Sequence, residues 1–280
     1  MKDYITNNVG KLWSFDLYPK AYESAKWFWR SLPFTNDINL RDDFHFDVTK
    51  KFENISILEL GSAMGGAYDF LKNQSNIDTS NFTGIEVSDV GIEYCKKKYP
   101  NAKWIHTDFD KYTLENRFDY SFERHAIHHM PNPLKQYEKV LQNTNYSFTT
   151  TFRGCINGPT ISDLDVGYFV SENGKYFMNI INFEELIILG LKHGFNNIRI
   201  DYRGLHEEIP KVLDENKMVL SGEIDRKKIL LSRFIISFRK DLKNKEIKIN
   251  LIRKKLYSPK YFFIMRGIEK KLKEIKNSCA

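Results

Sequence analysis

The sequence predicts an α/β protein built on a doubly wound, mostly parallel sheet. Strand patterns alternate with helix patterns through the first half of the chain, and a glycine-rich turn, Gly61 to Gly66, follows the first strand. The composition agrees with a folded core. Of 280 residues, 41% are hydrophobic and 14% aromatic, which is too apolar for a disordered chain.

The first half of the chain is expected to hold five strands and three helices. Short apolar runs bounded by turn residues mark the strands. Ser88 is expected to cap one helix, and prolines open another. The expected strands are 55–60, 82–87, 103–108, 117–125 and 146–152, and the expected helices are 67–74, 88–98 and 131–142.

The second half is expected to add one helix and two strands. The helix, 183–193, begins after Asn182, and Glu185 stands at the capping-box position. Residues beyond Lys240 have helical spacing. The expected strands are 197–202 and 228–238, and the segments without a regular pattern are 154–179 and 205–227.

Three parts are expected along the chain: an N-terminal helical cap at 1–51, a central domain at 52–240 and a basic helical extension at 241–280. The cap contains an aromatic helix at 18–34, which either packs into the core or covers a ligand pocket. The sequence has no signal-peptide pattern and no long apolar span, and its three cysteines form no CxxC pair. Because these features fit a reducing compartment, we expect a cytoplasmic protein.

The excess positive charge lies at the C-terminal end. Residues 239–280 hold 14 Lys and Arg against 4 Asp and Glu. The rest of the chain, residues 1–238, which we call the body, holds 29 Lys and Arg against 32 Asp and Glu, a net charge of −3. Nucleic acid is therefore an unlikely partner for the body. Apolar residues interleave with lysines in the tail, so it is expected either to contact an anionic membrane surface or to pack on its own domain or on a second copy.

The glycine-rich turn predicts a nucleotide-like ligand, because backbone without side chains allows close approach. Glu59 precedes this turn near the end of the first strand, where its carboxylate would repel a pyrophosphate but attract an ammonium or sulfonium group. Ala63 occupies a position where the dinucleotide fingerprint needs glycine. Both observations disfavour NAD and FAD.

The segment Glu59-Leu60-Gly61-Ser62-Ala63-Met64-Gly65-Gly66 resembles motif I of the class I S-adenosylmethionine-dependent methyltransferases, and later motifs follow in the same order. The resemblance implies a seven-stranded Rossmann-like sheet whose last strand is antiparallel. It also implies S-adenosyl-L-methionine as cofactor, with Glu86 on the ribose, Asp108 on the adenine amino group and Phe109 against the ring. The expected cofactor-binding residues are Glu59, Gly61, Ser62, Ala63, Gly65, Glu86, Val87, Asp108 and Phe109.

Two histidines after the fourth strand are candidates for a general base. His125 and His129 are four residues apart and could share a helical face, whereas His128 would point elsewhere. Both also fit a purely structural role, and positioning alone could suffice for methyl transfer. A metal is not expected, because the Asp-rich arrangement of metal-dependent relatives is missing.

The acceptor is expected to be a small molecule. The chain has no Pro-Cys pair, and Phe122 to His125 stands where DNA amino-methyltransferases carry an Asn/Asp/Ser-Pro-Pro-aromatic motif. O-methylation of a sugar-like or natural-product hydroxyl is the favoured reaction. N-methylation of a small amine, nucleic-acid methylation and a non-catalytic cofactor-binding scaffold remain alternatives.

Overall fold

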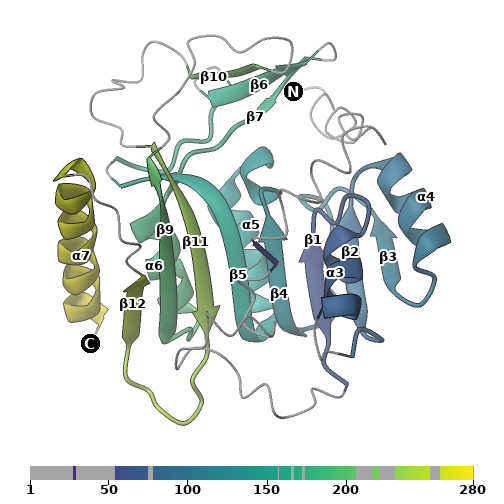
Figure 1. The fold of residues 1–280 in the computed structure, drawn as a ribbon, viewed down its shortest axis with the longest axis horizontal. Coiled ribbons are helices and arrows are strands. Elements are labelled where there is room, and N and C mark those ends of the chain that lie inside the picture. The colour runs from purple at the N-terminus through teal and green to yellow at the C-terminus, as the bar shows by residue number, and fades with distance from the viewer. Residues whose placement is uncertain are drawn as a thin grey trace. The chain divides into compact units, whose positions relative to one another are not determined.

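The computed structural model describes residues 28–29, 54–74, 78–156, 158–164, 167–171, 174–205, 217–220, 231–252 and 259–279 (Figure 1). The expected cap at 1–51 lies outside this range, except for Phe28 and Trp29. Both are helical and buried, and the Trp29 ring lies 5.6 Å from that of Phe70. The chain divides into two compact units, 1–126 with 143–145 and 127–142 with 146–280.

The first unit contains four parallel strands in the order β4, β1, β2, β3. Each strand is a short apolar run, and helices follow β1 and β2 as the alternating pattern predicts. The 107–117 connection between β3 and β4 contains only turns. The elements are β1 (Ile57–Leu60), α3 (Gly66–Gln74), β2 (Phe82–Glu86), α4 (Asp89–Lys98), β3 (Lys103–His106) and β4 (Phe118–Arg124).

Aromatic side chains fill the space between these helices and the sheet. The Tyr68 ring of α3 lies 5.2 Å from Phe82 on β2 and 5.8 Å from Trp104 on β3. Tyr99, just after α4, lies 5.1 Å from the same Tyr68 ring. Large apolar surfaces buried in this way supply most of the stabilisation of such a unit. They fix the strand ends that carry the site.

The second unit has a sheet ordered β12, β9, β11, β5, with the short β8 on β5. Strand β11 is antiparallel to both neighbours, as the resemblance implies for the last strand, whereas β12 is parallel to β9. The elements are η2 (Ile127–His129), α5 (Pro133–Gln142), β5 (Thr144–Cys155), β8 (Ile181–Asn182), α6 (Phe183–Lys192), β9 (Asn197–Leu205), β11 (Leu231–Arg239), β12 (Lys248–Ile252) and α7 (Pro259–Cys279).

The α/β class with mostly parallel strands is confirmed, but there are more strands than the expected seven. A separate three-stranded antiparallel sheet, in the order β10, β6, β7, forms from segments expected to be irregular. The expected helical tail also begins with a strand, β12. The strands of this separate sheet are β6 (Gly167–Ser171), β7 (Gly174–Phe177) and β10 (Lys217–Leu220).

Both predicted helix caps are confirmed. The Ser88 hydroxyl accepts from the Gly91 amide at 3.2 Å, and Asn182 Oδ1 accepts from the Glu184 and Glu185 amides at 2.7 and 3.1 Å. The expected capping box does not form, because the Asn182 amide donates to the Thr160 hydroxyl.

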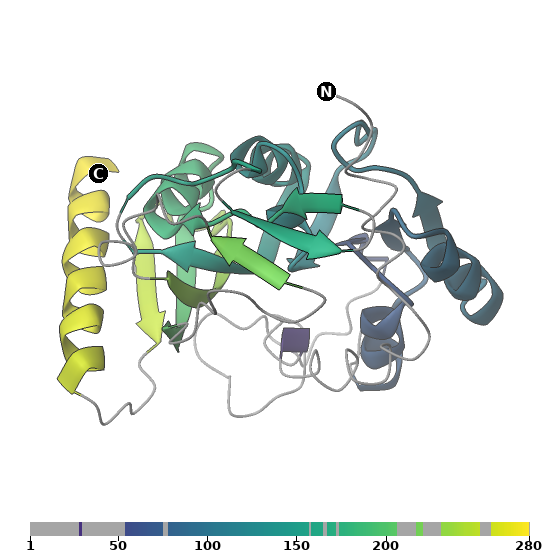
Figure 2. The same cartoon turned by 90° about the horizontal axis from the view of Figure 1, so that it is seen from above.

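The tail helix α7, yellow in Figures 1 and 2, packs on its own unit. Apolar residues spaced three or four apart form one stripe of α7, and this stripe is buried against α6 and β12. Lys271 of α7 also forms an ion pair with Glu184 of α6. The described part of the tail thus packs on its own unit, and contact with a membrane surface or with a second copy stays a prediction. No helix in the described ranges is long and apolar enough to cross a membrane. The stripe consists of Ile264, Ile268, Leu272 and Ile275.

Candidate functional site

The turn after β1 has left-handed backbone at every second residue. Gly61, Ala63 and Gly65 have φ angles of 69°, 46° and 71°. A Cβ on Gly61 would lie 2.6 Å from that of Ala126, and one on Gly65 would lie 2.9 Å from the Tyr99 ring. Glycine is therefore required at both positions, whereas Ala63 keeps its methyl group in a conformation that costs an L-residue about 1 kcal/mol.

The carboxyl end of β2 holds this turn in place. The Gly61 and Ser62 amides both donate to the Ile85 carbonyl, at 2.9 and 3.2 Å, and the Ser62 hydroxyl donates to the same oxygen at 3.2 Å. The Ser62 side chain is thus used inside the fold. The turn is a fixed backbone cradle at the ends of two neighbouring parallel strands, which is where open α/β sheets bind ligands.

Glu86 at the end of β2 completes the cradle. Its Oε2 accepts from the Ala63 amide at 2.7 Å, and its Oε1 accepts from the Val87 and Ser88 amides, each at 2.9 Å. Burial raises the pKa of Glu86, and these three amides act against that rise. A carboxylate oxygen can accept two hydrogen bonds, so Oε2, which accepts from the Ala63 amide, keeps the capacity to accept from a ligand hydroxyl.

Glu59 is the acidic group best placed for a cation. Its side chain is only 5% exposed, and Oε2 has no hydrogen-bond partner within the described part of the chain. Burial, followed by the nearby charge of Glu86, raises the pKa of Glu59 well above its usual range, while Arg124 acts in the opposite direction. A buried acceptor of this kind fits an ammonium or sulfonium ligand, which would supply the missing donor or charge.

The end of β3 brings a third carboxylate to this edge. Thr107 donates its amide to the Glu86 carbonyl at 3.0 Å, which fixes the residues just before Asp108. Asp108 Oδ1 accepts from the Asp110 amide at 3.1 Å, and Oδ2 lies 3.7 Å from Lys111 Nζ. Phe109 is buried at 3% exposure. All nine expected cofactor residues thus lie in or just after the carboxyl ends of three adjacent strands.

The histidines do not share a helical face, so that expectation is wrong. His125 has a φ of 58° and lies in the bend after β4, where the Ala126 amide donates to Glu123 Oε2 at 2.8 Å. His129 belongs to the single 3-10 turn η2 of the second unit. A left-handed residue breaks the helical register that a spacing of four would need.

His128 was expected to point elsewhere, but it contacts His129. Their Nε2 atoms are 2.9 Å apart, and His129 Nδ1 lies 2.9 Å from the Phe177 carbonyl oxygen. Because a carbonyl only accepts, Nδ1 of His129 carries the hydrogen, its Nε2 is the acceptor, and His128 is the donor between the rings. Sequence reasoning missed this pairing because it assumed a continuous helix.

Burial lowers the pKa of His129 to about 4, and the nearby charge of Arg153 contributes in the same direction. Its imidazole is therefore neutral at pH 7, and its Nε2 accepts the hydrogen bond from His128. Among the residues that the structure describes, no group of three or more His, Cys, Asp and Glu side chains could hold a metal ion.

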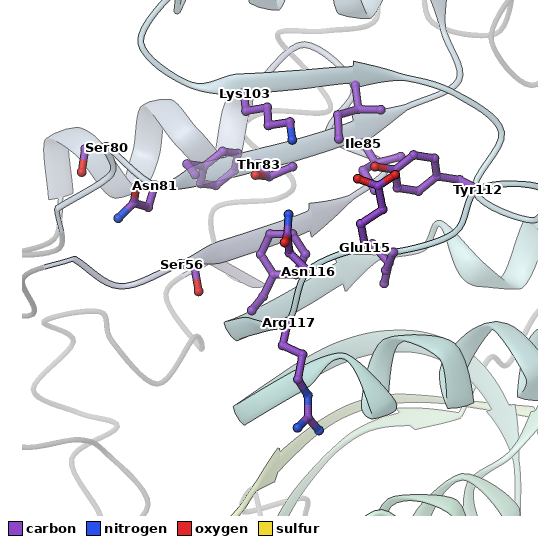
Figure 3. Close-up of a pocket in the computed structure, with 14 residues that line it drawn as sticks. Ser56, Ser80, Asn81, Thr83, Ile85, Lys103, Tyr112, Glu115, Asn116 and Arg117 are labelled. Atoms are coloured by element: carbon purple, nitrogen blue, oxygen red, sulfur yellow. The ribbon is translucent and has the colours of Figure 1, made fainter.

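A hollow of about 400 Å³ lies at the other edge of the first unit's sheet. Its lining includes Ser56, Asn81 and Lys103, at or just before the beginnings of β1, β2 and β3, and it contains none of the nine expected cofactor residues. Figure 3 shows polar side chains around it, including Lys103 and Glu115. It is a separate feature from the cofactor-type cradle.

Residues 57–145 match the family model described as a methyltransferase domain. The match runs from β1 into the start of β5 and includes every expected cofactor residue together with His125 and His129. A search of curated proteins finds no match.

Solved methyltransferase structures are also similar to this chain. An S-adenosylmethionine-dependent methyltransferase from Mesorhizobium loti is 13% identical, covering 69% of this chain and 94% of that one, with a TM-score of 0.43. Magnesium protoporphyrin IX methyltransferase from Synechocystis PCC 6803 with bound SAM is 10% identical. The match covers 66% of this chain and 70% of that one, with a TM-score of 0.41. An O-methyltransferase from a Brevibacillus brevis polyketide synthase multienzyme is 14% identical. The match covers 55% of this chain and 51% of that one, with a TM-score of 0.41. The match to the family model is confined to residues 57–145, about a third of the chain.

Proposed function

We propose that the chain contains a class I methyltransferase domain and that it transfers the methyl group of S-adenosylmethionine to a hydroxyl group of a sugar-like or natural-product acceptor. The observation that carries the cofactor part is Glu59, a buried carboxylate with an oxygen left without a donor, directly before the glycine-rich turn. S-adenosylmethionine supplies a methyl group on a positively charged sulfur, and it carries an ammonium group as well.

We assign the cofactor contacts to the carboxyl ends of β1, β2 and β3. Glu59 attracts the cationic part of the cofactor, Glu86 Oε2 accepts from a ribose hydroxyl, and Asp108 accepts from the adenine amino group. Phe109 packs against the ring. The support is that the three acids follow three successive parallel strands, and that Gly61 and Gly65 leave room beside the backbone.

The acceptor's hydroxyl must lose its proton as its oxygen bonds to the methyl carbon. We assign that proton to Nε2 of His129, whose other ring nitrogen donates to the Phe177 carbonyl and so keeps Nε2 unprotonated. His128 donates to this Nε2 in the structure, so its ring has to turn aside or be replaced by the acceptor hydroxyl. His125, in the bend after β4, is the second candidate for the base.

Transfer of labelled methyl from S-adenosylmethionine tests this proposal. The full chain is incubated with matched pairs of acceptors that differ only in a hydroxyl or an amine, such as a sugar and its amino-sugar counterpart. Label on the hydroxyl member is expected. Label only on the amine would replace O-methylation by N-methylation, and bound cofactor without transfer to either member would favour the scaffold alternative.

The roles of the histidines are tested with His129→Ala and His125→Ala. The expected result is a fall in kcat of about 10²-fold or more for the residue that takes the proton, with unchanged cofactor affinity. His193→Ala is the matched control, because that histidine is the C-cap of α6 and contacts Glu138, which is not among the candidate site residues. Full turnover in both site variants would remove the general base and leave positioning as the source of catalysis.

A further inference from the structure

The connection after β3 supplies no helix to one face of β2 and β3. In the parallel register Thr83 and Ile85 of β2 are level with Lys103 and Ile105 of β3, so these four side chains share that face. Helix α3 contacts the side chains of the opposite face. A doubly wound sheet is covered by helices on both faces, but the 107–117 connection contains only turns.

The hollow of about 400 Å³ in the first unit is lined by this face and by the connection. Its volume lies in the range of pockets that bind small ligands. Apolar side chains from both strands and from the connection line it, so a ligand would bury apolar surface there. These side chains are Ile85, Ile105, Leu114 and Phe118.

Two opposite charges line the same hollow. Lys103 stands at the start of β3 and Glu115 in the connection, and Figure 3 shows their side chains coming from two sides of the hollow. Both side chains are exposed, and within the described range 78–156 they form no ion pair with each other. Arg117 also lines the hollow, but in Figure 3 its guanidinium group points away from the others.

A ligand with one negative and one positive end matches this arrangement, because each end would meet the opposite charge. A free amino acid carries its two charges close together. The ends of a dipeptide are separated by about 6 Å, which suits two side chains that do not pair with each other. Thr83 and Asn116 add a hydroxyl and an amide to the lining, and both groups can hydrogen-bond a peptide group.

We propose that this hollow is a binding site for a short zwitterionic peptide with apolar side chains. Its carboxylate lies toward Lys103 and its ammonium group toward Glu115, and its side chains cover the apolar lining. The hollow contains none of the nine expected cofactor residues, so this inference goes beyond the proposed function and does not depend on it.

Titration of the full chain with three related probes tests the site. Leucyl-leucine carries both charges, its C-terminal amide lacks the carboxylate, and its N-acetyl derivative lacks the ammonium group. Calorimetry at pH 7 is expected to show saturable binding of leucyl-leucine at one site per chain, with a Kd of about 1 mM or below. Each derivative is expected to bind about 3-fold or more weakly, because it loses one exposed charge pair.

Two variants assign the charges to residues. Lys103→Gln is expected to bind leucyl-leucine and its amide equally and still to discriminate against the N-acetyl derivative. Glu115→Gln is expected to show the reverse pattern. Both side chains are exposed, so their replacement leaves no buried gap. Lys96→Gln and Glu93→Gln, on the exposed face of α4, are the matched controls and should bind all three probes as the unmodified chain does.

The inference is overturned if leucyl-leucine shows no saturable binding below about 10 mM, or if its affinity is the same in both site variants as in the unmodified chain. Tighter binding of the N-acetyl derivative than of leucyl-leucine would also overturn it, since the site would then select an anion. S-adenosylhomocysteine binding is measured on the same samples. Its loss would contradict the proposed function and leave the peptide site standing.

Discussion

Glu86 Oε2 accepts a hydrogen bond of 2.7 Å from the Ala63 amide. The acid at the end of β2 thus holds the turn at the end of β1, so one carboxylate is both a structural anchor and a candidate ligand contact. This arrangement explains why a buried acid is tolerated here, since three amides satisfy its two oxygens. It also makes the turn sensitive to any change of that side chain.

Glu86→Gln is expected to lower the free energy of unfolding by about 1–3 kcal/mol, because an amide NH2 cannot accept from a backbone amide. It is also expected to weaken S-adenosylhomocysteine binding. Chemical denaturation and calorimetry measure the two effects. Glu93→Gln, on the exposed face of α4, is the control and should change neither. Unchanged stability in Glu86→Gln would contradict the anchoring role.

Glu59→Gln is expected to move stability and binding in opposite directions. The substitution removes a buried carboxyl group whose ionised form is disfavoured by burial and by the charge of Glu86, so the ligand-free variant should gain stability relative to the unmodified chain as the pH rises. S-adenosylhomocysteine retains the ammonium group, and its affinity should fall about 10-fold or more. A variant that is less stable and binds normally would show that Glu59 is a structural acid.

Cofactor affinity is expected to fall as the pH is lowered through the raised pKa of Glu59. In the ligand-free chain this carboxyl binds a proton more tightly than in the unfolded chain. The contribution of Glu59 to the free energy of unfolding is therefore present at low pH and is lost as the pH rises. A cationic ligand favours the ionised form, and binding therefore releases a proton. Calorimetry in buffers of different ionisation enthalpy measures that release, which should vanish in Glu59→Gln.

The rate of methyl transfer at saturating cofactor is expected to stay level between pH 8 and pH 6. A base with the ordinary histidine pKa of about 6.5 would lose activity in this interval. The pKa of His129 is lowered to about 4, so it remains unprotonated throughout. A fall in kcat centred near pH 6.5 would point to another base, and His125 is the next to be replaced.

Ala63→Gly is expected to stabilise the chain by up to about 1 kcal/mol, because glycine adopts a φ of 46° without strain. Gly61→Ala is the opposite case. It places a methyl group 2.6 Å from the Ala126 Cβ at a φ of 69°, and it should destabilise the chain by about 2 kcal/mol or more. Thermal unfolding of both variants checks the turn, and equal melting temperatures would contradict the described backbone.

Local patterns in the sequence were enough to predict much of the first unit. The strands end where polar or glycine residues interrupt apolar runs, and Ser88 caps α4 as expected. The expected cofactor residues were chosen by their places at strand ends, since parallel strands bring those ends to one edge, and their contact with a cofactor stays a prediction. The sequence could not show that Ser62 and Glu86 are used by the turn itself, because those bonds join segments more than twenty residues apart.

The second unit was predicted less well, for a physical reason. Strand β10 is a four-residue segment that pairs with β6, about fifty residues earlier, so its pattern alone is weak. In β12, Ile249 and Leu251 alternate with polar residues, but the helical spacing of the rest of the tail obscured this signal. The histidine pair was missed because a spacing of four indicates a shared face only where the backbone is a regular helix.

Titration of the full chain with S-adenosylmethionine, and separately with NAD, tests the central claim most directly. The account predicts that S-adenosylmethionine binds with one site per chain, that NAD does not compete, and that Glu59→Gln weakens the binding while Glu93→Gln leaves it unchanged. Binding of NAD in the same cradle, or S-adenosylmethionine affinity that is indifferent to Glu59, would contradict it.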